Sequence, residues 1–173
     1  MATQNKQPVA VAYTLHGGPP ITKVYPEAAS QTFVKGEAVY LDANGRVAEY
    51  TSTIDDGTQR FLGFAAEDGH NNSTAGGSSC AVILPWGVVF EGNVCAAAGA
   101  DQITAITQVG TAYVLFENAT LNIVQIDISN SANQISAVRI VELSSRGSAL
   151  AGDTNGRVMF VVIPAAIQIT GAA

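Results

Sequence analysis

Short apolar runs rich in Val, Ile, Tyr and Phe recur along the chain, separated by clusters of Gly, Asn, Asp and Ser. Runs of this kind between turn-forming residues are typical of β-strands. No window of about 12 residues carries a convincing helical stripe, and a short helix within 96–107 is the weak exception. The predicted strands lie at 21–25, 38–42, 46–50, 61–66, 79–84, 87–92, 111–117, 121–128, 135–143 and 157–163.

The domain organisation follows from where this pattern starts and breaks. Residues 1–20 contain three Pro and a Gly-Gly pair, which predicts an extended N-terminal arm. We expect residues 21–173 to form an all-β domain, a compact antiparallel β-sandwich or barrel of about ten short strands. If this domain has two small lobes, their boundary is expected near 95–110. The Gly- and Ser-rich segment 69–79 is predicted to be an exposed, flexible loop.

One six-residue turn pattern occurs twice, as DANGRV at 42–47 and DTNGRV at 153–158. Asp at the first position of a type I turn and Gly in the bulge that follows fit a tight hairpin, and a two-residue Asn-Gly turn is the alternative. Both copies therefore predict hairpins. The repeat indicates either duplicated lobes or two unrelated turns that converged on one good sequence.

Composition narrows the class of protein. The 173 residues are 47% hydrophobic and only 13% charged, which excludes an intrinsically disordered chain. The apolar runs fall short of the roughly 20 residues that a membrane-spanning helix needs. With a net charge of −6 and no Lys or Arg between residues 61 and 138, the chain is a poor partner for nucleic acid or an anionic membrane. The first residues do not resemble a signal peptide, so assembly in a cytosol is expected.

Residues that could carry catalysis are sparse. His16 begins an HGG sequence like the oxyanion element of α/β-hydrolases, but the G-x-S-x-G elbow that such enzymes need does not occur. Neither His16 nor His70 has a metal-ligand partner at a suitable spacing. Asp55 and Asp56 lack the alternating acids of a calcium-binding loop. We therefore expect no catalytic residue, cofactor or metal.

Two weaker alternatives stay open. Among 14 acidic residues some pair can lie close in space, so a β-sandwich hydrolase or lyase with paired carboxylates is a third interpretation. Cys80 and Cys95 are expected to be two small buried core residues, and a disulfide between them is less favoured.

The low charge instead points to surface covered by another chain. So little polar surface implies either an unusually complete core or an apolar face buried in an assembly. In the arm, apolar residues alternate and could add a strand to a neighbour's sheet edge, and a frayed terminus is the alternative. The candidate partner-contact residues are Pro8, Val9, Val11, Tyr13 and Leu15.

Several segments resemble tailed-bacteriophage capsid decoration (cement) proteins. The stretch KGEAVYLDANGRV resembles their opening hairpin, and VRIVEL and NGRVMF resemble their closing part. The resemblance covers roughly residues 30–165. The matching segments lie at 35–47, 61–67, 81–84, 87–91, 138–143 and 155–160.

The resemblance implies a non-enzymatic structural protein of the virion. Such a protein binds the outer surface of an icosahedral capsid, often as a homotrimer and less often as a dimer, and its partner is the major capsid protein. It bridges neighbouring capsomers and stabilises the expanded shell after assembly in the bacterial cytoplasm. The alternative is a virion fibre or adhesin module in which the 69–79 loop binds a host-surface glycan.

Overall fold

The computed structural model describes residues 2–50, 61–129, 138–144 and 151–164. Within these ranges the chain forms eleven β-strands, and the predicted all-β class is confirmed. In place of the short helix expected within 96–107 there are two 3₁₀ turns, η1 (Ala97–Gly99) and η2 (Ile106–Gln108). No helix in the described ranges has the length and apolarity to cross a membrane. The strands are β1 (Ala10–Thr14), β2 (Thr22–Pro26), β3 (Ala38–Leu41), β4 (Val47–Glu49), β5 (Phe61–Ala65), β6 (Ser79–Ile83), β7 (Val88–Cys95), β8 (Ala112–Asn118), β9 (Ile123–Asp127), β10 (Val138–Leu143) and β11 (Arg157–Val162).

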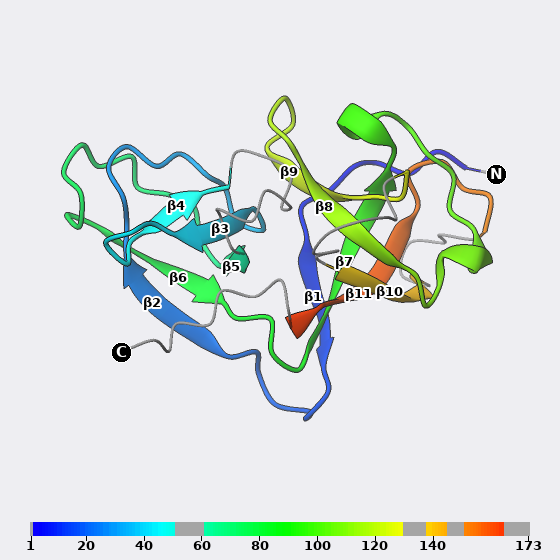
Figure 1. The fold of residues 1–173 in the computed structure, drawn as a ribbon, viewed down its shortest axis with the longest axis horizontal. Coiled ribbons are helices and arrows are strands. Elements are labelled where there is room, and N and C mark those ends of the chain that lie inside the picture. Colours follow the sequence, from blue (N-terminus) through cyan, green and yellow to red (C-terminus); the bar gives the residue numbers. More distant parts are fainter. Residues whose placement is uncertain (1, 51–60, 130–137, 145–150, 165–173) are drawn as a thin grey trace.

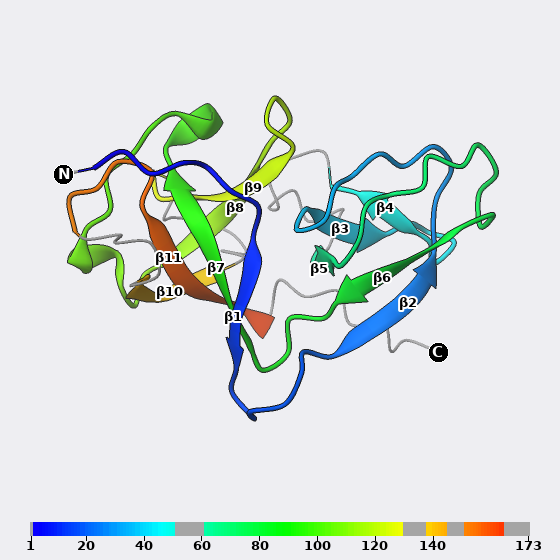
Figure 2. The same ribbon diagram turned by 180° about the vertical axis from the view of Figure 1, so that it is seen from behind.

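Five strands close into a small barrel in the order β7-β11-β10-β8-β9, because β9 also pairs with β7. The β7–β9 pairing is parallel and joins Val94 to Ile126, whereas the barrel's other pairings are antiparallel. β1 pairs with the first half of β7 and is the outermost strand of this sheet. Because the barrel is closed, none of its own strands is a free sheet edge. β1, which among the described strands pairs only with β7, is the edge strand of this sheet. The barrel and β1 form one side of the molecule (Figures 1 and 2).

The other five strands form an open antiparallel sheet beside the barrel, in the order β2-β6-β5-β3-β4. In β5 an extra residue shifts the register against β3, so that Ala38 pairs with Phe64 and Tyr40 with Phe61. A bulge of this kind lets two residues three positions apart face the same side. Phe61 and Phe64 therefore both pack in the core of the barrel, while Leu62 packs in a second core of the open sheet.

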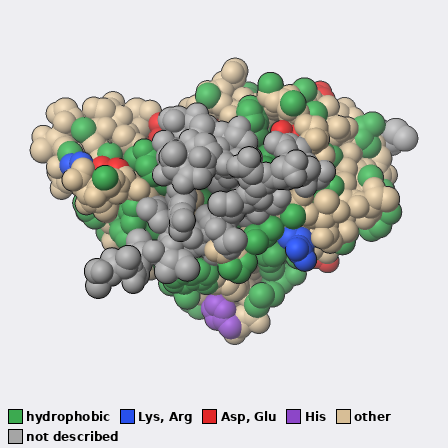
Figure 3. Space-filling view, viewed as in Figure 1, with side chains coloured by type: hydrophobic (Ala, Val, Ile, Leu, Met, Phe, Trp, Pro, Cys, Tyr) green, Lys and Arg blue, Asp and Glu red, His purple; other side chains and the backbone are tan. Residues whose placement is uncertain are grey.

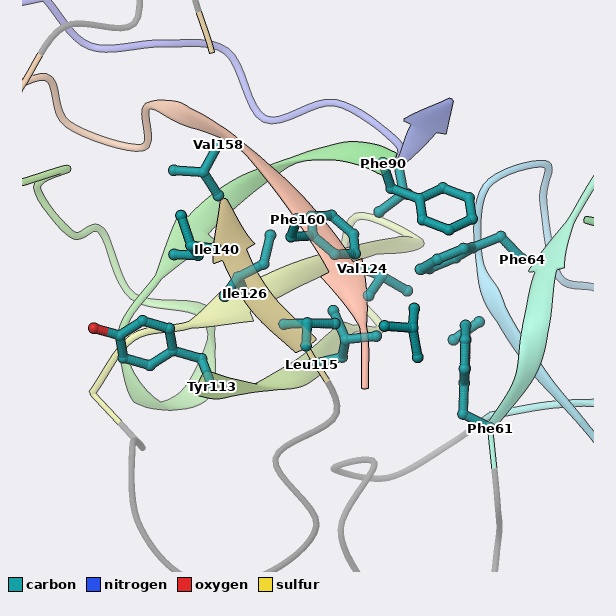
Figure 4. Packing of buried hydrophobic residues seen from close by; sticks show 14 of the residues in the cluster. Phe61, Phe64, Phe90, Tyr113, Leu115, Val124, Ile126, Ile140, Val158 and Phe160 are labelled. Carbon is teal, nitrogen blue, oxygen red and sulfur yellow. The ribbon is translucent and has the colours of Figure 1, made fainter. Parts of the chain in front are cut away.

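One hydrophobic core joins the two sheets. The ring centroids of Phe64 and Phe90 are 4.7 Å apart, and those of Phe64 and Phe160 are 6.2 Å apart. Figure 4 shows the Phe64 ring reaching from the open sheet toward these two residues, with Leu115 and Ile126 beside them in the barrel. Edge-to-face and tilted contacts between buried aromatic rings add to the free energy gained by their burial. The open sheet thus completes the core of the barrel.

The chain crosses between the two sheets at residues 15–21 and again at residues 84–87. The segment 95–110, where a boundary between two lobes would lie, connects β7 with β8, and both are barrel strands. This Ala- and Gly-rich segment is a loop that packs on the barrel, where η1 contacts both β8 and β9. Within the segment 1–20, predicted as an arm, β1 pairs with β7 of the barrel sheet.

The two copies of the repeated turn sequence differ. The first forms the predicted hairpin between β3 and β4: Gly45 N donates to Asp42 O at 2.9 Å, and Arg46 N donates to Asp42 Oδ1 at 2.9 Å. Gly45 has a φ of 73°, as the bulge requires. The prediction for the second copy is wrong, since all of 144–156 separates β10 from β11. There Asp153 accepts a hydrogen bond from the start of the chain, and the repeat does not mark duplicated lobes.

Candidate functional site

The N-terminal segment runs along its own barrel and does not project as a free arm. Before β1 begins, Gln7 N donates to Asn93 Oδ1 at 2.8 Å. The buried guanidinium of Arg157 donates to Pro8 O at 3.4 Å and lies 3.3 Å from the carboxylate of Glu91. A buried cation held by such fixed partners orients them in turn. The barrel therefore positions the segment that leads into β1.

The five predicted contact residues of the arm fall into two groups. Val9 is buried in the main core, and Val11 packs against that core. Pro8, Tyr13 and Leu15 are exposed. The alternating apolar residues do not all point to one face of β1, because the register of β1 shifts between Val11 and Tyr13. In this conformation Pro8, Tyr13 and Leu15 are the most accessible of the five, whereas Val9 holds the segment to its own barrel.

Exposed apolar side chains gather where the chain crosses between the sheets. Leu15 and Ile21 lie on the first crossing and Trp86 on the second, and all three are exposed. Leu15 N donates to Gly87 O at 2.8 Å, so the two crossings run side by side. We call Leu15, Ile21 and Trp86 the crossover patch. In the view of Figure 3, hydrophobic side chains lie along the lower edge of the molecule, where the crossings are. Clustered apolar surface is typical of protein contact sites.

Three carboxylates meet where the open sheet faces the barrel. Glu37 directly precedes β3, Glu49 ends β4, and Glu117 is the last residue but one of β8. One carboxylate oxygen from each residue lies within 4.8 Å of the other two. Elements of both sheets thus bring acidic side chains together, which the sequence analysis did not foresee. The one local signal is the position of Glu117, two residues after the inward-facing Leu115 on the same strand.

Burial controls the protonation of this cluster. Glu37 is only 1% exposed, and its Oε2 accepts a hydrogen bond from Val34 N at 2.6 Å. Its Oε1, together with Oε2 of Glu117, is buried and has no hydrogen-bond partner among the described residues. Desolvation raises the pKa of Glu37 to about 7 and the pKa of Glu117 to about 8, and the neighbouring carboxylates add to both shifts. Near neutral pH the cluster therefore holds protons or a cation.

What this acidic cluster could bind depends on its ligand atoms and on how far solvent or a substrate can reach them. Carboxylate oxygens alone suit a hard cation such as Ca²⁺, whereas Zn²⁺ is usually bound by His and Cys. Glycosidases separate their two carboxyl groups by about 5 Å or more and hold the sugar between them. In this cluster Glu37 is only 1% exposed, so Glu49 and Glu117 are its more accessible members.

The cysteines serve the core. Cys80 and Cys95 are both free and buried, so their interpretation as small core residues is confirmed. Burial raises the pKa of each thiol to about 12, which keeps them protonated. The acidic residues Asp55 and Asp56 lie outside the described residues.

The histidines lie in two separate loops. His16 is exposed in the first crossing. His70 lies in the 69–79 loop, with its Nδ1 2.6 Å from Oε1 of Glu27. This loop is largely exposed, as predicted, but Asn71 N donates to Gln31 O at 2.9 Å and further backbone bonds tie the loop to residues 27–33.

The comparisons with known proteins add no relative. No protein-family model matches the chain, and no curated protein matches it. The resemblance to phage decoration proteins therefore stays a prediction. What the molecule offers for an assignment is its two-sheet fold, the exposed crossover patch, the edge strand β1 and the buried acidic cluster.

Proposed function

We propose that this protein is a structural protein of a bacteriophage virion. It binds the outer surface of an icosahedral capsid as a homotrimer, contacts the major capsid protein and bridges neighbouring capsomers to stabilise the expanded shell. The observation that carries this proposal is the crossover patch, whose three large apolar side chains are each exposed on two adjacent crossings. Such side chains gain most when another protein covers them, and aromatic anchors dominate binding energy at interfaces.

The edge strand offers a second contact. β1 is the outermost strand of its sheet, and it leads directly into Leu15 of the crossover patch. An exposed edge strand can accept a strand from a neighbouring molecule. Copies related by a symmetry axis would repeat this contact, so that a modest affinity per contact gives strong overall attachment.

The distribution of charge supports an outer position on the shell. The net charge is −6, and residues 61–138 contain no Lys or Arg. Packaged DNA would repel such a chain, since binding to phosphates relies on Lys and Arg.

Counting copies in purified particles tests the proposal. Quantitative peptide counting against the major shell protein should give a near-stoichiometric ratio. A handful of copies per particle would instead indicate a fibre or adhesin that binds a host-surface glycan. Absence from particles would overturn both virion roles and bring the interpretation as an acid-pair enzyme forward.

A pair of variants tests the crossover patch itself. We expect Leu15→Ser combined with Trp86→Ser to weaken binding to expanded shells about 10-fold or more in a co-sedimentation assay. The matched control is Ile106→Ser, because Ile106 is 67% exposed in η2 and Leu15 is 68% exposed. The control should bind like the wild type. Equal binding by all three proteins would exclude this patch as the contact.

A further inference from the structure

We propose that Glu37, Glu49 and Glu117 bind a Ca²⁺ ion that ties the open sheet to the barrel. The site lies at the junction of the two sheets, away from the crossings that carry the crossover patch. It is independent of the capsid role, because it depends on contacts within one chain.

The spacing of the carboxylates fits a calcium ion. Oxygen ligands surround Ca²⁺ at about 2.3–2.6 Å, so two ligands on opposite sides are up to about 5 Å apart. One oxygen from each of the three residues lies within 4.8 Å of the other two, which places a common ion within reach of all three. Carboxylates can also bind through both oxygens, and this helps to supply the six to eight ligands that Ca²⁺ takes.

The clearest indication of a ligand is the orphaned oxygen of Glu37. The residue is 1% exposed, and both its backbone groups are bonded: Glu37 N donates to Val34 O at 3.0 Å, and Ala65 N donates to Glu37 O at 2.9 Å. Its Oε2 is held by Val34 N, and its Oε1 is buried without a donor among the described residues. A buried acceptor in this position costs free energy unless something binds it.

Among the described residues, no cation is paired with the cluster, since none of the ion pairs formed by Lys, Arg or His involves these three residues. Oxygen ligands alone point away from Zn²⁺. Mg²⁺ usually keeps several of its own waters, whereas Ca²⁺ accepts the flexible coordination by several carboxylates. Among biological cations, Ca²⁺ fits three converging carboxylates best.

Ion binding would strengthen the junction between the open sheet and the barrel. Glu37 and Glu49 belong to the open sheet and Glu117 to the barrel. An ion bound to all three adds a polar link to a junction otherwise joined by the shared aromatic core. A ligand that binds only the folded chain stabilises it in proportion to the logarithm of its concentration above Kd.

Thermal unfolding and calorimetric titration of the full chain test the site. After treatment with EDTA and dialysis, CaCl₂ at about 100 times Kd should raise Tm by about 5–10 °C. Titration should show one ion bound per chain. Glu117→Gln should abolish both effects, whereas Glu142→Gln removes the same charge at an exposed position of β10 and should keep them. If Glu117→Gln does not fold, Glu49→Gln at a half-buried position is the second variant, with the same expected loss.

Two outcomes would overturn the proposal. A calcium response of equal size in wild type and in the folded Glu117→Gln or Glu49→Gln variant would place the ion elsewhere on the surface. No response of the wild type to CaCl₂ would mean that the cluster is balanced by shared protons alone. Because these measurements need no capsid, failure here leaves the virion role untouched, and failure of the virion role leaves this site untouched.

Discussion

The ring of His70 links the loop between β5 and β6 to the end of β2. Its Nδ1 lies 2.6 Å from Oε1 of Glu27, and its backbone N–H donates to the other oxygen of the same carboxylate at 3.2 Å. The Glu27 side chain is buried, whereas the His70 side chain is 47% exposed, so the ring can exchange its proton with water. The hydrogen bond and charge of Glu27, with a smaller contribution from Glu67, raise the pKa of His70 above its ordinary value.

We expect the stabilisation by this pair to decline as pH rises. Because the folded-state pKa of His70 lies above the unfolded value of about 6.5, the contribution is complete below that pH and is lost as pH rises through the folded-state pKa. Urea unfolding of wild type and His70→Gln should therefore differ most near about pH 5.5 and least near about pH 9. In a Glu27→Gln background this pH dependence should disappear. Its persistence there would assign it to another group.

At the scale of elements, β5 and β6 lie close together at Gly63. A Cβ on Gly63 would overlap the carbonyl oxygen of Ile83, so the backbones of two paired strands would have to separate. We expect Gly63→Ala to lower the free energy of unfolding by about 1–3 kcal/mol, measured by urea unfolding. Gly18→Ala is the control, since the nearest atom there is 3.3 Å away on the exposed ring of His16. Equal losses from both substitutions would contradict a close contact at Gly63.

The same scale shows what the sequence could predict. The ten predicted runs, each a β-branched or aromatic run between turn residues, coincide with β2 to β11, whereas β1 lies in the segment predicted as an arm. The parallel contact of β7 with β9 has no such signal, because it depends on packing between distant segments. The acidic cluster depends on how the sheets meet, since Glu37 and Glu49 reach it from one sheet and Glu117 from the other. The sequence alone indicates only that Glu117 points to the same side of its strand as Leu115, two residues before it.

At the scale of the whole molecule, the two sheets form one cooperative unit. Phe64 is centred 4.9 Å from Phe61 and 4.7 Å from Phe90, so the aromatic core continues from the open sheet into the barrel. The topology adds to this coupling, because β1 joins the barrel sheet before the chain builds the open sheet and returns. Neither sheet can complete its burial without the other. We therefore expect a single two-state unfolding transition.

Truncation of neighbouring residues in β5 separates the role of the shared core from that of the second core. Phe64 and Leu62 are both buried, and Leu62 packs within the open sheet. Each change to Ala should lower the free energy of unfolding by about 2–5 kcal/mol. Only Phe64→Ala weakens the contact between sheets, so its calorimetric enthalpy should exceed its van't Hoff enthalpy, while the two enthalpies should agree for Leu62→Ala. If the two agree for Phe64→Ala as well, the sheets are coupled mainly through the chain crossings and the acidic cluster. Repeating the scan with CaCl₂ and with EDTA then separates these two contributions, because only the cluster responds to the ion.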